Sequence, residues 1–290
     1  MKQLLDRFLL LQPVWLPTLL FIPLLYALGW ITAVPLTLLG LPAHQLSLTG
    51  TVLSFVLFLL VMPRWAALRW SEHQPWRRLG LVGRNPRNRI PHVTSLCIGL
   101  LMSVALITLI VGLLVFTGRG IWQGSLTINA VLNCLLLTLG VGLAEELIFR
   151  AWLWEELTLI IGATGGMLGQ AALFSLVHTR LNLGILPMLG LLTGLFLLGL
   201  VLALLRYRNH GSLWGSIGLH GGLVGAWFLV HQNLLTITPN APMWLVGPGG
   251  SAANPLGGAV AILSLTAIVV YLLQHTQRIR FYHPKNSAHN

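Results

Sequence analysis

The sequence contains very little charge, and almost none of that charge is acidic. Only 8% of its 290 residues are charged, and just six residues are Asp or Glu. A soluble domain carries about 25% charged residues, so this chain lacks the polar side chains needed to face water on all sides. Hydrophobic residues make up 56% of the sequence, and the mean hydropathy is +0.82. These values predict a protein that lies mainly within a membrane.

Cysteine is also scarce. Cys97 and Cys134 lie in separate apolar runs without the spacing of metal ligands, so we expect two buried thiols. The long apolar runs exclude the alternating pattern of a membrane β-barrel. The segments that cross the membrane should therefore be α-helices, which satisfy their own backbone hydrogen bonds in lipid.

A helix needs about 20 apolar residues to cross a bilayer. Apolar runs of that kind cover residues 8–40, 48–68, 93–116, 126–150, 163–180, 184–205, 212–232 and 258–277. The expected fold class is therefore all-α, a polytopic membrane helix bundle of about eight transmembrane helices. We divide the chain into an N-terminal part with a basic loop (1–92), a core (93–235), and a last part with a Pro/Gly-rich loop, the final helix and a basic tail (236–290).

The basic residues predict the orientation of these helices. The formal charge of +11 would suit a nucleic-acid-binding protein, but the basic residues sit in short loops between the expected spans, so we exclude nucleic acid as a partner. With the N-terminus in the cytoplasm, all but three of the 17 Lys and Arg residues face the cytoplasm. Arg119 and Arg180 fall outside, and Arg150 lies within a helix. This asymmetry favours an integral protein of the plasma membrane, in contact with membrane lipid, with both termini cytoplasmic.

The stretch "AEELIFRAWLWEE", residues 144–156, concentrates four of the six acidic residues between apolar flanks. Glu146 and Arg150 are spaced i, i+4 and should form an ion pair along the helix. Glu145 points about 100° away from Glu146 and has no local cation. An ionisable residue at membrane depth is costly and indicates a functional site. We therefore predict a functional role for Glu145 and a structural one for Glu146 and Arg150.

Glu155 and Glu156 come shortly before Ile161 and Gly162, where we expect the helix to end. We interpret them as a solvated helix end at the cytoplasmic surface and assign them no catalytic role. Beyond this turn the chain should return as an antiparallel helix. Glu145 lies sixteen residues before Ile161 and His178 sixteen after Gly162, so the two side chains should meet at the same height, roughly 3–6 Å apart, within one water's reach.

A third polar group lies on a glycine-rich helix. The pairs Gly218/Gly222 and Gly221/Gly225 have the spacing that lets helices approach closely, so His220 is expected to face the bundle interior. His231, eleven residues later, lies on nearly the same face. Packing is the better interpretation of His231, and lining a cavity is the alternative.

Together these residues resemble the CAAX-protease and bacteriocin-processing (CPBP, or Abi) family of intramembrane proteases. The family pattern is Glu-Glu-x-x-x-Arg, then Phe-x-x-x-His, then His-x-x-x-Asn. Here the motifs are "EELIFR" (Glu145, Glu146, Arg150), "FSLVH" (Phe174 to His178) and "HGGLV" (His220 to Val224). The resemblance covers roughly residues 95–235.

The resemblance implies an eight-helix metalloprotease-like core that hydrolyses a membrane-associated peptide or protein, with prenylated CAAX substrates as the best-known class. Glu145 and His178 would activate a water, and Glu146, Arg150 and Phe174 would support the site. His220 would help to stabilise the oxyanion. Two alternatives stay open for the water: a zinc ion held by Glu145, His178 and His220, or the glutamate alone.

One position departs from the family pattern. Val224 replaces the asparagine and cannot donate a hydrogen bond, and the loss of one oxyanion donor can cost about 10²–10³ in rate. Asn182, Asn133 or a backbone N–H are the candidate replacements. A catalytically silent scaffold or immunity-type binding protein on the same fold is therefore the first rival interpretation, and a transporter or proton relay is the second. No inverted repeat supports transport, and the presence of Glu145 with both histidines favours the protease.

Overall fold

The structure is a computed structural model that describes residues 2–83, 90–249 and 253–275. Its α-helices are α1 (Lys2–Leu9), α2 (Trp15–Ala33), α3 (Leu46–Arg69), α4 (Pro75–Arg78), α5 (His92–Phe116), α6 (Ile128–Glu145), α7 (Trp154–Leu176), α8 (Ile185–Arg208), α9 (Trp214–Leu229), α10 (Met243–Val246) and α11 (Ala259–Gln274). Two π-helical segments are η3 (Glu146–Leu153) and η4 (Val230–Leu234), and three 3₁₀ turns are η1 (Val34–Leu39), η2 (Ala43–Gln45) and η6 (Pro255–Gly257). Strand β1 (Gly120–Trp122) pairs antiparallel with β2 (Leu235–Ile237), with Gly120 opposite Ile237.

The predicted all-α membrane bundle is confirmed. Every apolar run that the sequence marked contains a helix, and five helical stretches are long and apolar enough to cross a membrane by length and composition. One of them, Ile128–Leu176, holds two of the expected spans. It leaves helical geometry at Gly162 (φ 78°, ψ 170°), where the turn was predicted. The chain then folds back on itself. Gly166 packs so closely against Thr158 that an added Cβ would overlap it.

Some of the basic residues from which the orientation was predicted lie outside the described residues. They are Arg84, Arg87, Arg89, Arg278, Arg280 and Lys285. Arg206, one of the arginines counted on the cytoplasmic side, is buried within the protein. Its Nη1 donates to the carbonyl oxygen of Arg150, and its Nη2 donates to that of Arg78 over 3.2 Å.

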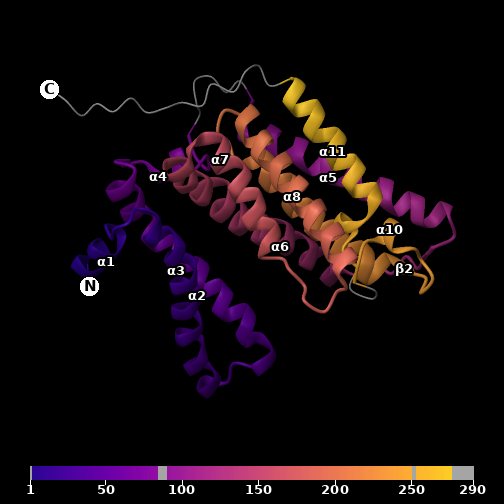
Figure 1. Cartoon of the computed structure of the whole chain (residues 1–290). Helices are drawn as coiled ribbons and strands as arrows, with labels where there is room; N and C mark the ends of the chain where they lie inside the picture. Colours follow the sequence, from indigo (N-terminus) through magenta and orange to yellow (C-terminus); the bar gives the residue numbers. More distant parts are fainter. Residues whose placement is uncertain (1, 84–89, 250–252, 276–290) are drawn as a thin grey trace.

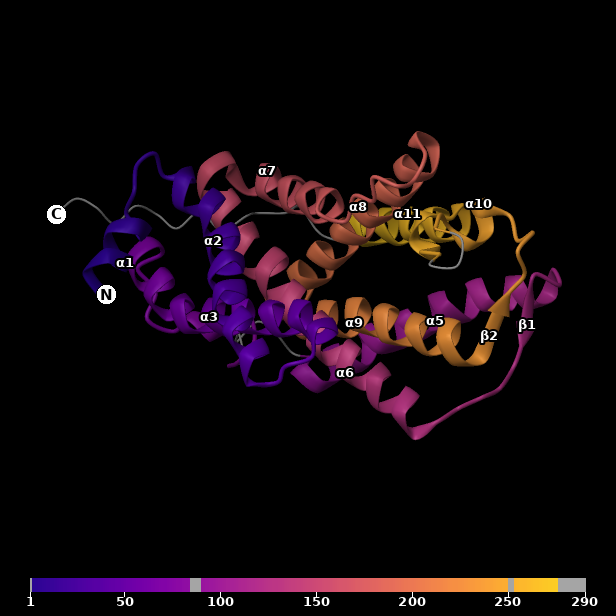
Figure 2. The same cartoon turned by 90° about the horizontal axis from the view of Figure 1, so that it is seen from below.

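Helix α9 lies against α5 on one side and α6 on the other (Figure 2). Its glycines make both contacts possible. A Cβ at Gly218 would overlap the backbone of Leu96 in α5, and a Cβ at Gly221 would overlap the carbonyl of Thr138 in α6. The predicted small-residue face is therefore present on two sides of the helix, and it carries His220 into the centre of the bundle.

Helices α2 and α3 form a hairpin that stands beside the rest of the bundle in Figure 1 and joins it near α1, α4 and the start of α7. An ion pair ties α1 to this hairpin, because Arg64 Nη2 lies 2.6 Å from Asp6 Oδ2. The hydrogen bonds from Arg64 lower the pKa of the Asp6 carboxyl, which lies outside the apolar stretches.

The prediction that Glu155 and Glu156 form a solvated helix end is wrong for Glu156. Its side chain is fully buried, and four residues of the α2–α3 unit donate to it. Thr18 Oγ1 and Arg69 Nη2 each lie 2.6 Å from Oε2, and the indole nitrogens of Trp65 and Trp70 lie 2.8 and 2.7 Å from Oε1. The partners come from residues far earlier in the chain, so local sequence carried no signal of them.

Because this carboxylate holds the hairpin, Glu156→Gln should loosen the N-terminal unit. The change leaves Arg69 buried without its counter-ion, and breaking a buried pair typically costs about 3–5 kcal/mol. Thermal unfolding and limited proteolysis in detergent micelles measure the effect.

The matched control is Glu72→Gln. Glu72 is partly exposed and accepts the backbone N–H of Gln74 over 2.7 Å, so the loss of its charge should cost at most about 1 kcal/mol. Equal stability of the two variants would show that the Glu156 contacts do not hold the hairpin.

Candidate active site

The centre of the candidate site is the carboxylate of Glu146, which opens the π-helical segment η3. It is fully buried, as is Arg150. Oε1 of Glu146 lies 3.1 Å from Nη1 of Arg150 and 2.8 Å from Nδ1 of His220. The predicted ion pair is thus confirmed, and it is extended by a histidine from α9. Segments of π-helix occur frequently at functional sites.

Phe174 of α7 is the apolar residue that Arg150 and both histidines of this cluster contact. The guanidinium of Arg150 lies 3.9 Å from the ring centroid, and the rings of His178 and His220 lie 4.8 and 5.4 Å away. The three nitrogens of Arg150 have no hydrogen-bond partner, so the ion pair to Glu146 and the contact with the Phe174 face hold this cation. Phe174 therefore supports the site by packing, as expected.

Glu145 meets both histidines. Its Oε2 lies 3.8 Å from Nε2 of His178 and 3.7 Å from Nε2 of His220. The approach predicted from the symmetry of the hairpin is confirmed, and so is the inward direction of His220. Oε2 of Glu145 is buried and has no hydrogen-bond partner.

The hydrogen bonds of the histidines define their tautomers. Nδ1 of His178 lies 2.7 Å from the carbonyl oxygen of Phe174, which can only accept, so this nitrogen carries the proton. Nδ1 of His220 faces the Glu146 carboxylate in the same way. In each neutral ring Nε2 then has a free lone pair, and it lies 3.7–3.8 Å from Oε2 of Glu145. The three acceptors lie close together, and a water molecule beside them could donate to two of them.

These groups open into a cavity of about 440 Å³ between α5, α6, α8 and α9. Its walls are largely apolar, with Ile110, Val141 and Leu198 among them, and the polar residues that line it include Arg180 and His231. His231 therefore lines the cavity, which was the less favoured alternative.

Val224 also lines the cavity, one turn beyond His220. Neither predicted replacement for its missing amide reaches this position, because Asn133 and Asn182 are exposed and do not line the cavity. The amides that do line it are Gln232 and Asn254. Sequence reasoning missed both of them.

Asn254 reaches the cavity because the Pro/Gly-rich loop that carries it is hydrogen-bonded to α9. The indole N–H of Trp227 donates to the carbonyl oxygen of Ala253 over 3.0 Å. This bond holds the Pro/Gly-rich loop against α9 one turn after Val224. Local sequence gives no sign of such a contact between residues 26 positions apart.

The donor atoms suit zinc in their chemistry, since glutamate and histidine are common zinc ligands. Among the residues that the structure describes, no group of three or more His, Cys, Asp or Glu side chains is arranged to hold a metal ion. Nε2 of His178 and Nε2 of His220 lie 3.8 and 3.7 Å from Oε2 of Glu145.

The fold and the site define a class of protein: a helical membrane protein with a glutamate–histidine centre buried among its helices. Residues 127–226 match the family model described as type II CAAX prenyl endopeptidase Rce1-like. This segment contains all three motifs, from Glu145 to Val224, and its match supports the CAAX protease family that the motifs resembled. Residues 2–74 match a domain of unknown function (DUF8676). No curated protein and no solved structure matches the chain significantly.

The buried pair makes Arg150 a structural residue. Arg150→Ala would leave Glu146 buried without its cation, a change that typically costs about 3–5 kcal/mol. We expect a large loss of folded protein in the membrane fraction, measured by yield and by thermal unfolding in detergent.

His178→Ala serves as the control, because His178 is partly exposed and makes its hydrogen bond to a backbone carbonyl. This variant should fold. A well-folded but inactive Arg150→Ala protein would instead show that the arginine takes part in the chemistry.

Proposed function

We propose that the protein is an intramembrane endopeptidase that cleaves a membrane-associated peptide or protein. The observation that carries this proposal is that Nε2 of His178 and Nε2 of His220 both lie within 3.8 Å of Oε2 of Glu145, and that all three residues line a largely apolar cavity. The match of residues 127–226 to a CAAX prenyl endopeptidase family supports it.

In the proposed reaction Glu145 acts as the general base. A water between Glu145 and His178 gives one proton to Oε2 of Glu145, and its other proton is held by Nε2 of His178. The water oxygen then attacks the carbonyl carbon of the scissile peptide bond. The proton on Glu145 is transferred to the leaving nitrogen when the C–N bond breaks. General acid–base catalysis of this kind contributes about 10²–10⁴ in rate.

His220 is proposed to stabilise the oxyanion. Oε1 of Glu146 lies 2.8 Å from Nδ1 and orients the ring, as the carboxylate does in other carboxylate–histidine pairs. When Nε2 carries a proton, its N–H would donate to the negative oxygen of the tetrahedral intermediate. Glu146 and Phe174 are positioning residues in this scheme, since both hold the His220 ring.

The substrate is proposed to be a peptide carrying apolar groups. The cavity walls are formed mainly by aliphatic and aromatic side chains of α5, α8 and α9, and such walls favour apolar ligands. A prenylated CAAX peptide is the first candidate, because the matched family is described by that activity.

Val224 favours a second candidate function, a silent membrane scaffold of the immunity type. A valine at this position leaves the cavity one amide donor short of the family pattern. Gln232 and Asn254 line the same cavity and are the groups that could replace it. A transporter or proton relay has less support, since the glutamate–histidine centre lies in a protease-family domain.

We also propose that the protein resides in the plasma membrane with both termini cytoplasmic. The support is the distribution of basic residues along the chain. Arg77 and Arg78 would then lie at the cytoplasmic surface, and Arg180 at the opposite one.

The purified protein should cleave members of a peptide library that includes prenylated CAAX peptides. Glu145→Gln should lower kcat/KM by at least about 10²-fold, because the general base is lost. His220→Ala should abolish cleavage, and Val224→Asn should preserve or raise it. Chromatographic detection of the products measures each rate.

Glu155→Gln is the matched control, since it removes a neighbouring carboxylate that does not line the cavity, and it should retain activity. If no folded variant cleaves any peptide, and if Glu145→Ala keeps the biological activity of the protein, the silent scaffold is the correct interpretation and the protease assignment fails.

Zinc is the alternative means of activating the water. Held by Glu145, His178 and His220, a zinc ion would supply a Lewis acid that lowers the pKa of its bound water. Because the described side chains form no closed three-ligand group, we expect cleavage to persist after treatment with a chelator. Activity that is lost on chelation and restored by added zinc would support the metal-dependent alternative instead.

A further inference from the structure

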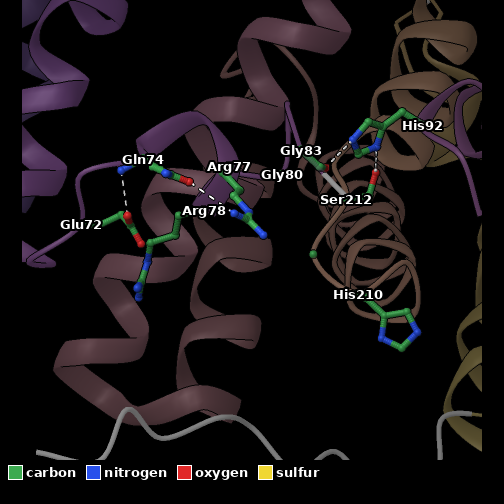
Figure 3. Close-up of a pocket in the computed structure, with 10 residues that line it drawn as sticks. Glu72, Gln74, Arg77, Arg78, Gly80, Gly83, His92, His210 and Ser212 are labelled. Atoms are coloured by element: carbon green, nitrogen blue, oxygen red, sulfur yellow. Dashed lines mark hydrogen bonds between the residues drawn. The ribbon is translucent and has the colours of Figure 1, made fainter. Parts of the chain in front are cut away.

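A second cavity of about 450 Å³ lies apart from the candidate active site (Figure 3). One wall is the segment from Glu72 to Gly83, and the other is formed by His92 and the α8–α9 turn from His210 to Ser212. Ser212 precedes α9, whereas Gln232 of the first cavity follows it. The 20 residues between them span about 30 Å of helix. The two cavities therefore sit towards opposite ends of the same helices.

The second cavity is rich in basic side chains. Arg77, Arg78, His92 and His210 line it, and Glu72 is its one acidic residue among those that the structure describes. The guanidinium of Arg77 is exposed, and its contact with Gln74 is long, 3.4 Å from Nη1 to Oε1. Figure 3 shows Arg77 between the Glu72 wall and the Ser212 wall. This arginine is thus available to a ligand.

Arg78 is fixed beside it. Its Nη2 lies 2.9 Å from Oε2 of Glu155, while its Nε is buried without a hydrogen-bond partner. The Glu155 pair holds this arginine in place, and the unused Nε is a donor that the surrounding protein does not satisfy.

Hydrogen bonds join the two walls of this cavity without a ligand. Nε2 of His92 donates to the carbonyl oxygen of Gly83 over 2.8 Å, and its Nδ1 lies 3.0 Å from Oγ of Ser212. The backbone N–H of Leu213 donates to the carbonyl oxygen of Gly80 over 3.1 Å. A Cβ at Gly80 would overlap the carbonyl of Gly211, so the two turns touch directly. A preformed site loses little entropy on binding.

We propose that this cavity binds the phosphate group of an anionic ligand, foremost the headgroup of an anionic phospholipid. Arginine recognises phosphate well because its planar fork makes two parallel hydrogen bonds. Basic pockets between membrane helices bind anionic headgroups. Trp214, whose indole donates to the carbonyl oxygen of Leu81 next to the cavity, is a residue type enriched at the membrane interface.

Binding of dioctanoyl phosphatidylglycerol to the purified full chain in nonionic detergent tests the proposal, with dioctanoyl phosphatidylcholine as the neutral probe. Phosphatidylglycerol should bind more tightly. Arg77→Gln should weaken that binding by roughly tenfold, since it removes a charge-assisted hydrogen bond. Glu72→Gln should strengthen it, because the only carboxylate lining the cavity among the described residues loses its charge. Isothermal titration measures both changes.

Arg208→Gln is the matched control. Arg208 is exposed on the last turn of α8, near the cavity but outside its lining, so its loss should change binding little. Equal weakening by Arg77→Gln and Arg208→Gln, or none by Arg77→Gln, would overturn the proposal in favour of unspecific attraction to a basic surface.

Inorganic phosphate, without lipid, is the last probe in this binding experiment. If it binds and displaces the lipid, with the same sensitivity to Arg77→Gln, the cavity recognises a free phosphate group and the proposed chemistry holds. If only the lipid binds, the headgroup is the ligand. If neither probe binds, the proposal fails.

Discussion

The fully buried carboxylate of Glu146 is the constraint on which the rest of the site depends. A charge without access to water needs partners, because its desolvation is otherwise uncompensated. Arg150 supplies the cation from the same helical segment, and His220 supplies a second contact from α9. The second contact requires α9 to lie close to the other helices, and its glycine faces permit that approach. The position of His220 thus follows from the need to satisfy Glu146.

A second buried carboxylate performs the same task at the other end of the acidic stretch. Glu156 collects hydrogen bonds from Thr18, Trp65, Arg69 and Trp70, and so joins the α2–α3 hairpin to α7. The hairpin lies in the region that matches a domain of unknown function, and Glu156 lies in the region that matches the protease family. The Glu156 side chain therefore links two segments of the chain that match different family models.

The roles of the four glutamates in this stretch follow from their surroundings. Glu146 and Glu156 are fully buried, and their contacts support the fold: Oε1 of Glu146 contacts Arg150 and His220, and both oxygens of Glu156 accept hydrogen bonds. Glu155 is partly exposed and pairs with arginines near the second cavity. Glu145 differs from all three, because its side chain lines the cavity and its buried Oε2, which has no hydrogen-bond donor, lies 3.7–3.8 Å from two imidazole nitrogens. An acceptor left without a donor beside an apolar cavity is the arrangement that a water-activating base requires.

The sequence by itself determined the features that rest on local geometry. Apolar run length indicated the helices, the i, i+4 spacing indicated the Glu146–Arg150 pair, and equal distances from the turn at Gly162 indicated that Glu145 and His178 meet. Only the tertiary structure decided the burial of Glu156, the hydrogen bond between His220 and Glu146, and the entry of Asn254 into the cavity. The physical reason is that helix geometry relates residues a few positions apart, or across a short turn, by fixed distances. Contacts between distant segments depend on how whole helices pack, and no spacing within one segment records that packing.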